Sequence, residues 1–338
     1  MNDPDVAIVI VSWNTREILR DCLRSVYENA GTVDFQVIVV DNASTDGSAP
    51  MVATDFPRVQ LIANTENRGF AAANNQGMAL ARGRYVLLLN SDTVVLDRAI
   101  EKAVAFADTH PEAAVVGCRV LNVDRTLQPT CFMFPSALNL LLSFTYAYKL
   151  FPKSRFWGRE LMTYWDRNDI RQVDVVTGCF MLVRQEAIAQ VGRMDDSFFM
   201  YAEETDWCYR FRAAGWKVMF VPSANIIHLG GASSRQVASK MRLQTSGSIL
   251  YFLKKHKSRW EYVLGCLFTA LFFLVRVPVW WVKGCLCRSE RSHAWRVART
   301  YAAGAAAACR GYEGLCVARR AEPPRAVPPG ASVPRADG

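Results

Sequence analysis

Two polar clusters hold the residue types with which this chain could do chemistry. The first, Asn90-Ser91-Asp92, ends a run of five apolar residues that starts at Tyr85. A carboxylate placed there suits a divalent cation, because Mg²⁺ is usually held by one or two carboxylates together with substrate phosphates. In the alternative, Asn90 and Asp92 only cap a turn and the next helix. The stretch alone leaves both interpretations open.

The second cluster is the acidic stretch from Asp195 to Asp206, in which Glu203 and Glu204 follow an apolar, aromatic segment. Burial raises the proton affinity of a carboxylate and can tune it as a general base. We favour that role for both glutamates, because adjacent buried acids are costly without partners. The alternative is an acidic first turn that stabilises the helix dipole, and we interpret Asp206 this way, paired with Arg210.

His228 is a third candidate, since it ends an apolar segment and precedes Gly230 and Gly231. A single histidine is usually structural, but glycines allow a ligand to approach the backbone closely. Both a structural role and metal ligation stay open.

Alternating strand, turn and helix patterns must position these residues. Apolar runs predict buried strands at 6–12, 35–40, 59–63, 85–90 and 113–120, with helices between them. Such units form a parallel sheet with right-handed crossovers, so Ser12, Asp41 and Asp92 should share one sheet edge, where ligands of α/β sheets bind. Asp41 is either a turn residue or a nucleotide-binding acid.

The second half of the core can be placed only loosely. Aromatic residues between 138 and 165 suit core packing, membrane contact or sugar stacking. A bent strand is expected over 173–184, where Gly178 marks a bulge or the close approach of a ligand. Another strand is expected over 217–222.

Charge divides the chain into a neutral body and a basic tail. The net charge is +9, and from Lys254 onward 15 Lys and Arg face 5 Asp and Glu. Because this basic region flanks an apolar run, an anionic membrane surface is a better partner than nucleic acid. The ten scattered cysteines are expected to be reduced thiols, and the acidic start at Met1 indicates a cytoplasmic protein without a secretory signal.

The apolar run at 263–275 is shorter than the roughly 20 residues that span a bilayer. Extending it to Val282 reaches that length but includes Arg276 and Pro278. An interfacial or re-entrant helix, a true span and a buried core helix all stay open. The proline-rich end, 321–338, is expected to be disordered.

Six motifs in order carry a family resemblance. Over residues 6–260 the chain resembles the family 2 glycosyltransferases and their rhamnosyltransferase-like branch. The motifs are Val11-Ser12-Trp13-Asn14, Asp41-Asn42-Ala43-Ser44-Thr45-Asp46-Gly47-Ser48, Asn67-Arg68-Gly69-Phe70, Leu89-Asn90-Ser91-Asp92, Glu203-Glu204-Thr205-Asp206 and His228-Leu229-Gly230-Gly231.

The resemblance implies a GT-A-type fold, a mostly parallel Rossmann-like sheet flanked by helices. It implies inverting transfer of a sugar, rhamnose being one candidate, from a dTDP- or UDP-sugar to a lipid-linked or cell-surface glycan, with Mg²⁺ or Mn²⁺. The implied roles are catalysis by Glu204 or Glu203, metal binding by Asp92 and His228, acceptor binding by Gly178 and Trp207, and nucleotide binding by Ser12, Asn14, Asp41, Asn67, Arg68, Gly69, Asn90 and Ser91.

The chain departs from the family pattern at two positions. Asn90 replaces the first acid of the Asp-x-Asp metal motif, so metal binding depends more on Asp92 and His228. Glu204 stands where the family usually has the aspartate of a Glu-Asp pair, which leaves the base assignment between Glu203 and Glu204.

We expect residues 1–125 to form the nucleotide-sugar half and 126–253 the acceptor-binding and catalytic half of one domain. Residues 254–320 should form a membrane-associated helical region at the inner face of the cell membrane. A non-catalytic nucleotide-sugar-binding or scaffold protein is the main alternative. A dehydrogenase is weaker, because the turn after the first strand lacks the glycine fingerprint.

Overall fold

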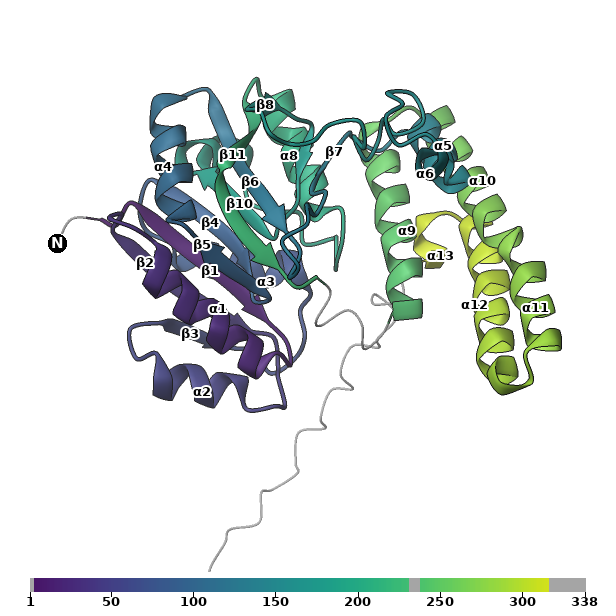
Figure 1. Ribbon diagram of the computed structural model, residues 1–338, viewed down its shortest axis with the longest axis horizontal. Helices are drawn as coiled ribbons and strands as arrows, with labels where there is room; N and C mark the ends of the chain where they lie inside the picture. Colours follow the sequence, from purple (N-terminus) through teal and green to yellow (C-terminus); the bar gives the residue numbers. More distant parts are fainter. Residues whose placement is uncertain (1–2, 231–237, 316–338) are drawn as a thin grey trace, which may run out of the picture.

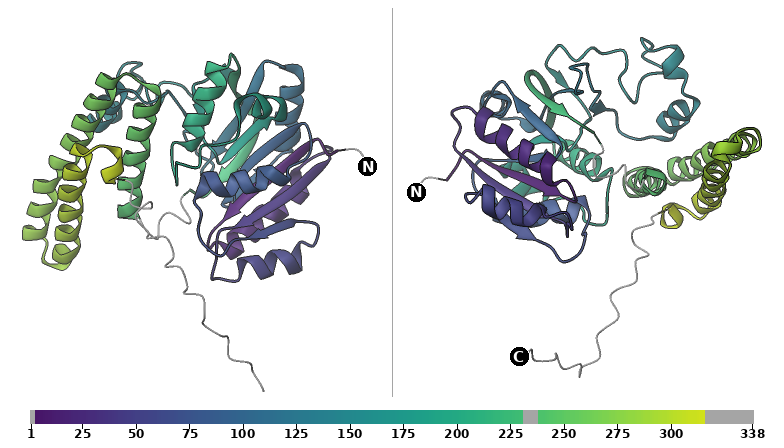
Figure 2. Two further views of the ribbon diagram at one scale, coloured as in Figure 1. Left: turned by 180° about the vertical axis from the view of Figure 1, so that it is seen from behind. Right: turned by 60° about the horizontal axis from the view of Figure 1, so that its bottom comes forward.

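The structure is a computed structural model that describes residues 3–230 and 238–315. Gly231 and the proline-rich end at 321–338 lie outside the described residues. Figure 1 shows a sheet domain covered by helices and, beside it, a separate layer of long helices. The view from behind in Figure 2 shows the same arrangement.

A large sheet forms the first unit, in the order β3-β2-β1-β4-β10-β6-β11-β5, with β8 on β11. Strands β1 to β4 are parallel, β10 is antiparallel to both of its neighbours, and β5 is antiparallel to β11. The predicted mostly parallel sheet is therefore confirmed. The strands are β1 (Val6–Ser12), β2 (Phe35–Asp41), β3 (Gln60–Ala63), β4 (Tyr85–Asn90), β5 (Thr93–Leu96), β6 (Ala113–Leu121), β8 (Arg171–Gln172), β10 (Phe180–Arg184) and β11 (Lys217–His228).

Helices cover both faces of this sheet because its central strands are apolar on both sides. Along β1, Ile8 and Ile10 pack into one hydrophobic cluster and Val9 into the other. The first cluster is closed by α1 (Arg16–Asn29), α2 (Ser48–Asp55) and α4 (Ala99–Thr109), and the second by α3 (Phe70–Leu80), α7 (Gln185–Val191) and α8 (Glu203–Ala213). A small ribbon of β7 (Cys131–Phe132) and β9 (Val175–Val176) adds to the second.

The second unit is a helical bundle with its own core. Its members are α5 (Ala137–Thr145), α6 (Ala147–Leu150), α9 (Ala238–His256), α10 (Arg259–Leu274), α11 (Arg276–Leu286), α12 (Arg291–Cys309) and α13 (Tyr312–Leu315). The core of this bundle is a third hydrophobic cluster, and it also contains Phe198 and Ala202 from the loop before α8. The expected boundary at residue 253 therefore falls inside α9, and the bundle core reaches into the catalytic half.

Strand register brings the predicted edge residues together. Ser12 pairs with Asp41 across β1 and β2, and Val11 pairs with Asn90 across β1 and β4. The chain then turns at Ser91 and Asp92 into β5, which the sequence analysis did not predict. Since Thr93 pairs with His228 in β11, this turn sets Asp92 beside His228.

Candidate active site

A cavity of about 550 Å³ opens at the carboxyl edge of β1 and β4. Most of the predicted site residues line it, although they come from separate segments of the chain. They are Asn67, Gly69, Asn90, Ser91, Asp92, Gly178, Glu203, Glu204 and His228. The cavity therefore combines a strand-end carboxylate, a histidine and two glutamates in one place.

Asp92 and His228 form the polar pair on one wall. Nε2 of His228 lies 3.1 Å from Oδ1 of Asp92 and 3.3 Å from Nδ2 of Asn90. On the far side of the ring, Nδ1 lies 2.6 Å from Oε1 of Gln128. The Gln128 amide nitrogen donates to Asn122 Oδ1 and to the His228 carbonyl oxygen, so Oε1 is the acceptor and Nδ1 carries the donated proton.

This hydrogen-bond pattern fits a cation ligand. In the neutral imidazole with a proton on Nδ1, the one lone pair of Nε2 accepts from the Asn90 amide and lies beside the Asp92 carboxylate. Two acceptors as close as Nε2 and Asp92 Oδ1 gain from a cation between them, which would take the place of the bond from Asn90. Among the described residues no group of three or more His, Cys, Asp or Glu side chains could hold a metal ion. Two protein ligands nevertheless suit Mg²⁺ or Mn²⁺ when substrate phosphates and water complete the coordination.

Glu203 and Glu204 open α8 and line the same cavity as this pair. The two residues before them, Tyr201 and Ala202, have left-handed backbone conformations with φ of 69° and 66°. This tight turn directs the first turn of α8 to the cavity. Among the described residues, Oε2 of each glutamate is buried without a hydrogen-bond partner.

Burial shifts the protonation of both glutamates. The pKa of Glu203 is raised well above its ordinary value by burial and then by the neighbouring charge of Glu204. The pKa of Glu204 is also raised by burial, but backbone N–H groups of Glu204 and Thr205 partly offset the rise. Glu203 is only 4% exposed, and Glu204 is less buried. Both carboxyls thus hold a proton more tightly than a free glutamate does, and at Glu203 burial and the neighbouring charge act in the same direction.

The predicted nucleotide-binding residues divide into two groups. Asn67, Gly69, Asn90 and Ser91 line the cavity, whereas Ser12, Asn14, Asp41 and Arg68 do not. Ser12 bonds Thr15 at 2.9 Å, and Asn14 accepts a bond from the Thr45 N–H at 2.8 Å. Both side chains therefore hold the loops behind the cavity wall.

Asp41 is buried in the same region. Its Oδ2 accepts a bond from the Ser44 N–H at 3.0 Å, which is the turn-forming role considered for it. Its Oδ1 is buried without a hydrogen-bond partner among the described residues. Its role in nucleotide binding stays a prediction.

The two predicted acceptor-binding residues have different surroundings. Gly178 lines the cavity, where an added Cβ would lie 3.2 Å from the ring of Phe70. Trp207 does not: it is fully buried, and its indole N–H donates to the Gly192 carbonyl at 2.8 Å. The acceptor-binding prediction for Trp207 is wrong, because this side chain packs in the core behind α8.

Sequence reasoning missed two residues that position the site. Gln128 fixes the ring of His228 from 100 positions away, and no local signal marks it. Asn42 was part of a quoted motif but had no assigned role. Its Nδ2 donates to the Gly69 carbonyl at 3.0 Å and to Asn67 Oδ1 at 3.2 Å, so it holds the Asn67–Gly69 turn against the end of β2.

Comparison with known proteins agrees with this geometry. Residues 7–192 match the profile of the family described as "Glycosyl transferase family 2". The chain belongs to this family. It is a glycosyltransferase, and the dehydrogenase alternative is wrong.

Several relatives of this glycosyltransferase are similar to it over most of its length. An N-acetylglucosaminyl-diphospho-decaprenol L-rhamnosyltransferase of Mycobacterium tuberculosis is 29% identical over 242 residues, 67% of this chain and 76% of the relative. Rhamnosyltransferase WbbL of Escherichia coli K12 is 23% identical over 261 residues, 74% of this chain and 93% of the relative.

A solved structure with the same fold is a mannosyltransferase from Pyrobaculum calidifontis in complex with GDP-Man and Mn²⁺. It superposes with a TM-score of 0.55 at 15% identity, over 92% of this chain and 88% of that chain. At this identity the likeness supports the GT-A fold alone.

Proposed function

We propose that this glycosyltransferase transfers rhamnose, with inversion, from a dTDP- or UDP-linked donor to a hydroxyl of a lipid-linked glycan. The observation that carries the proposal is one cavity lined by both the Glu203–Glu204 pair and the Asp92–His228 pair. The named activities of the two rhamnosyltransferase relatives support the choice of sugar.

In this reaction the oxygen of the acceptor hydroxyl attacks the anomeric carbon, and Glu204 takes the proton of that hydroxyl. The bond from that carbon to the donor diphosphate breaks on the opposite face, so a single displacement inverts the configuration. A sugar hydroxyl is a weak nucleophile, and a positioned base contributes about 10²- to 10⁴-fold in rate. Glu203 lies beside it and is the deeper of the two glutamates.

The diphosphate leaving group would lie against Asp92 and His228. These two residues would hold Mg²⁺ or Mn²⁺, which neutralises negative charge on the leaving diphosphate when bound. Asn90 bonds Nε2 of His228 and lacks the charge of an aspartate, so Asp92 would be the one carboxylate that holds the cation here. Gln128 keeps the imidazole in the orientation and tautomer that present Nε2 to the site.

Lipid-linked glycans lie in a membrane, and we propose that the enzyme acts at the cytoplasmic face. Within the described residues, 259–286 form one helix long and apolar enough to cross a bilayer by length and composition alone, which is weak evidence for a membrane anchor.

The direct test is transfer with a purified polyprenyl-diphosphate N-acetylglucosamine acceptor and a set of nucleotide sugars. We expect release of dTDP or UDP that requires both the acceptor and a divalent cation. Anomeric configuration read by NMR should differ between donor and product. Retention of configuration, or donor binding without any transfer, would contradict the proposal. The second result would favour the non-catalytic alternative.

A further inference from the structure

One exposed apolar face runs along α10 and α11. The two helices are separated only by Val275, which has a right-handed helical backbone, so they form almost one helix of 28 residues. Every exposed residue from 260 to 282 is apolar, and these residues recur at intervals of about three or four. They are Trp260, Val263, Leu264, Leu267, Leu271, Leu274, Val275, Pro278, Val279, Trp281 and Val282. We call this surface the α10–α11 face.

Three charged side chains between residues 260 and 286 of this helix pair have partners within the protein. Arg276 donates to the Phe272 carbonyl at 2.7 Å, and its guanidinium lies 3.6 Å from the centre of the Phe272 ring. Lys283 pairs with Glu290 at 2.6 Å. Glu261 accepts a bond from the N–H of Ala137 in α5 at 3.3 Å. The face is therefore free of charge, as contact with hydrocarbon requires.

The opposite side of the helix is committed to the bundle, which argues against a membrane span. Phe273 is fully buried there, and a Cβ on Gly265 would lie 2.5 Å from Leu253 of α9. Helix α12 packs along the same side and exposes Arg296 and Arg299. A span would draw these arginines toward the hydrocarbon core, which is costly for guanidinium groups.

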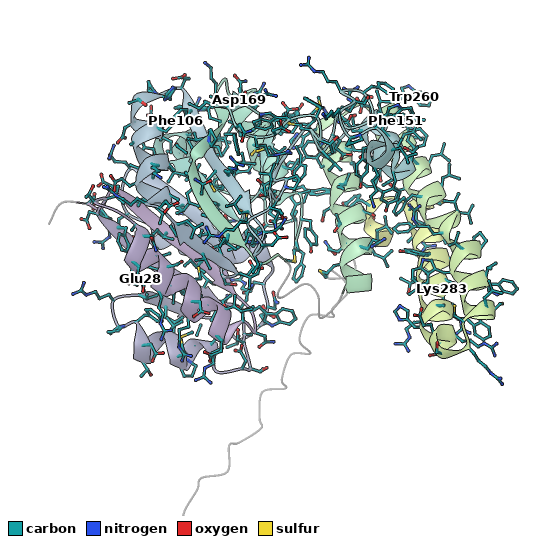
Figure 3. All side chains as sticks on the ribbon, viewed as in Figure 1. Glu28, Phe106, Phe151, Asp169, Trp260 and Lys283 are labelled. Carbon is teal, nitrogen blue, oxygen red and sulfur yellow. The ribbon has the colours of Figure 1, made fainter. Side chains whose placement is uncertain are left out.

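The ends of the face carry the side chains that favour a membrane interface. Trp260 and Trp281 are 76% and 59% exposed, and tryptophan concentrates at the headgroup level of bilayers. Arg259 and Arg288 lie just beyond the two ends and are exposed. Figure 3 labels Trp260 near one end of the bundle and Lys283 near the other. An anionic lipid surface matches this apolar face with basic ends.

We propose that the α10–α11 face docks the enzyme on an anionic bilayer, with helices α10 and α11 lying in the plane of the interface rather than crossing it. At about 1.5 Å per residue the helix would extend about 42 Å along the membrane. The proposal deepens the proposed function in one respect: it holds the cavity at the membrane that contains the acceptor.

Flotation of the full-length protein with vesicles of phosphatidylcholine and phosphatidylglycerol tests the surface. Replacing Leu267 and Leu271 by Asn should weaken vesicle binding by on the order of ten-fold for each substitution. Each leucine is about half exposed, so docking on the bilayer would bury the other half of its side chain and gain about half of the free energy of burying a whole leucine. The matched control replaces Leu80 and Val123, exposed apolar residues of the sheet domain, by Asn and should float like the wild type.

Labelling of native cysteines tests the orientation. Cys285 and Cys287 are exposed at the carboxyl end of α11. With protein added outside intact vesicles, an in-plane helix leaves both thiols open to a membrane-impermeant maleimide, located by peptide mass mapping. A span entered from outside would protect them until detergent is added, and that result would overturn the in-plane arrangement.

Two measurements separate this proposal from its alternatives. Light scattering without vesicles shows whether the wild type dimerises and the leucine variant does not; a dimer that fails to float would assign the face to a second copy of the chain. Calorimetry with dTDP and Mn²⁺ should give equal affinity in wild type and variant. If the wild type floats with vesicles but transfers no sugar, the docking surface stands and the proposed function fails. If the wild type does not float but transfers sugar to a soluble acceptor, the proposed function stands and the docking surface fails.

Discussion

Glu203 and Glu204 are adjacent, yet burial gives them different proton affinities. Glu203 has the more strongly raised pKa, with burial as the main cause and Glu204 as the second. Glu204, the less buried of the two, is the base in our proposal. The sequence shows two identical side chains and does not reveal that they differ in burial.

Glu204→Gln should lower the transfer rate by about 10²- to 10⁴-fold and leave the affinity for the donor nearly unchanged, because the amide cannot accept a proton. Steady-state rates with calorimetric donor affinities measure both quantities. Glu203→Gln is the matched control and should have the smaller effect on rate. A reversed ranking would make Glu203 the base.

Glu203→Gln should also stabilise the protein at neutral pH. A carboxyl whose pKa is raised in the folded state contributes stability at low pH, and this is lost as pH rises above the unfolded value of about 4.3. The glutamine variant lacks this loss, so its melting temperature should exceed that of the wild type at pH 7. Below about pH 4 the difference should vanish. If the gain in melting temperature were the same at every pH, its cause would be better packing of the glutamine rather than the raised pKa of Glu203.

Gln128→Leu should weaken the affinity for Mn²⁺ with dTDP by about 10- to 100-fold, the usual effect of removing the partner that orients a metal-binding histidine. Calorimetry measures this loss, and Asp92→Asn and His228→Ala should cause losses at least as large. The control Asn122→Ala removes an acceptor of the Gln128 amide and a hydrogen bond to Thr126 but leaves the bond between Gln128 and the His228 ring, and it should cost less. If the Asp92 and His228 variants bound Mn²⁺ with dTDP as tightly as the wild type does, the proposed metal site would be contradicted.

At the scale of elements, α9 contacts the segments on both sides of Glu203 and Glu204. Ser248 donates to the Met200 carbonyl at 2.9 Å, just before them. Lys255 bridges Asp195 at 2.8 Å and Asp206 at 2.7 Å, and His256 lies 2.6 Å from Asp206. The predicted pair of Asp206 with Arg210 is also present, at 2.8 Å. Asp206 therefore joins α8 to α9 and does more than complement a helix dipole.

Asp206→Asn should destabilise the protein by about 3 kcal/mol, because it leaves Lys255, His256 and Arg210 without their shared anion. Despite burial, hydrogen bonds from His256 and Lys255 lower the pKa of Asp206 to about 2. Its contribution is present above the unfolded value of about 3.9 and is lost as pH falls toward 2. Urea denaturation at pH 7 and pH 3 measures this, and the penalty of the variant should shrink at pH 3. The surface variant Asp169→Asn should show little change at either pH, since surface ion pairs contribute at most about 1 kcal/mol.

Elements were predictable from sequence where the signal is local. The apolar runs of β1, β2 and β4 and the positions of their polar ends follow from the local sequence pattern. Strand β5 was missed because it starts only two residues after β4, where the sequence was interpreted as a turn before a helix, although its antiparallel pairing places Asp92 against His228. The insertion of β10 between β4 and β6 depends on long-range pairing, which no local pattern encodes.

The same division explains the errors in the site. Trp207 stands three residues after Glu204, and an aromatic residue near acids fits a sugar platform as well as a core position. Its burial is decided by α8 packing on the sheet, which requires the tertiary fold. Gln128 and Lys255 act across about a hundred and about fifty positions, so only the folded chain shows their partners.

At the scale of the whole molecule, the helical bundle and the catalytic loop share one hydrophobic core. Phe198 and Ala202, directly before the glutamates, pack with Phe252 and Leu253 of α9, and the same cluster continues to Phe273 of α10. A bundle that is only a membrane anchor would not need these contacts. The sequence predicted only a membrane-associated helical region over 254–320, because apolar and basic residues look alike whether they face lipid or protein.

Phe273 and Leu274 are neighbours with opposite surroundings, 0% and 57% exposed, and they separate the two functions of the bundle. Phe273→Ala should cost about 3–5 kcal/mol of stability, the usual cost of emptying a buried aromatic site. Because the shared core reaches the glutamates, it should also lower the rate on a soluble acceptor. Leu274→Asn should change stability by less than about 0.5 kcal/mol, as surface substitutions do, yet weaken vesicle flotation. Urea unfolding followed by tryptophan fluorescence and by activity should show one transition in both variants. Two transitions, with Phe273→Ala moving only the one that leaves activity unchanged, would make the bundle an independent domain.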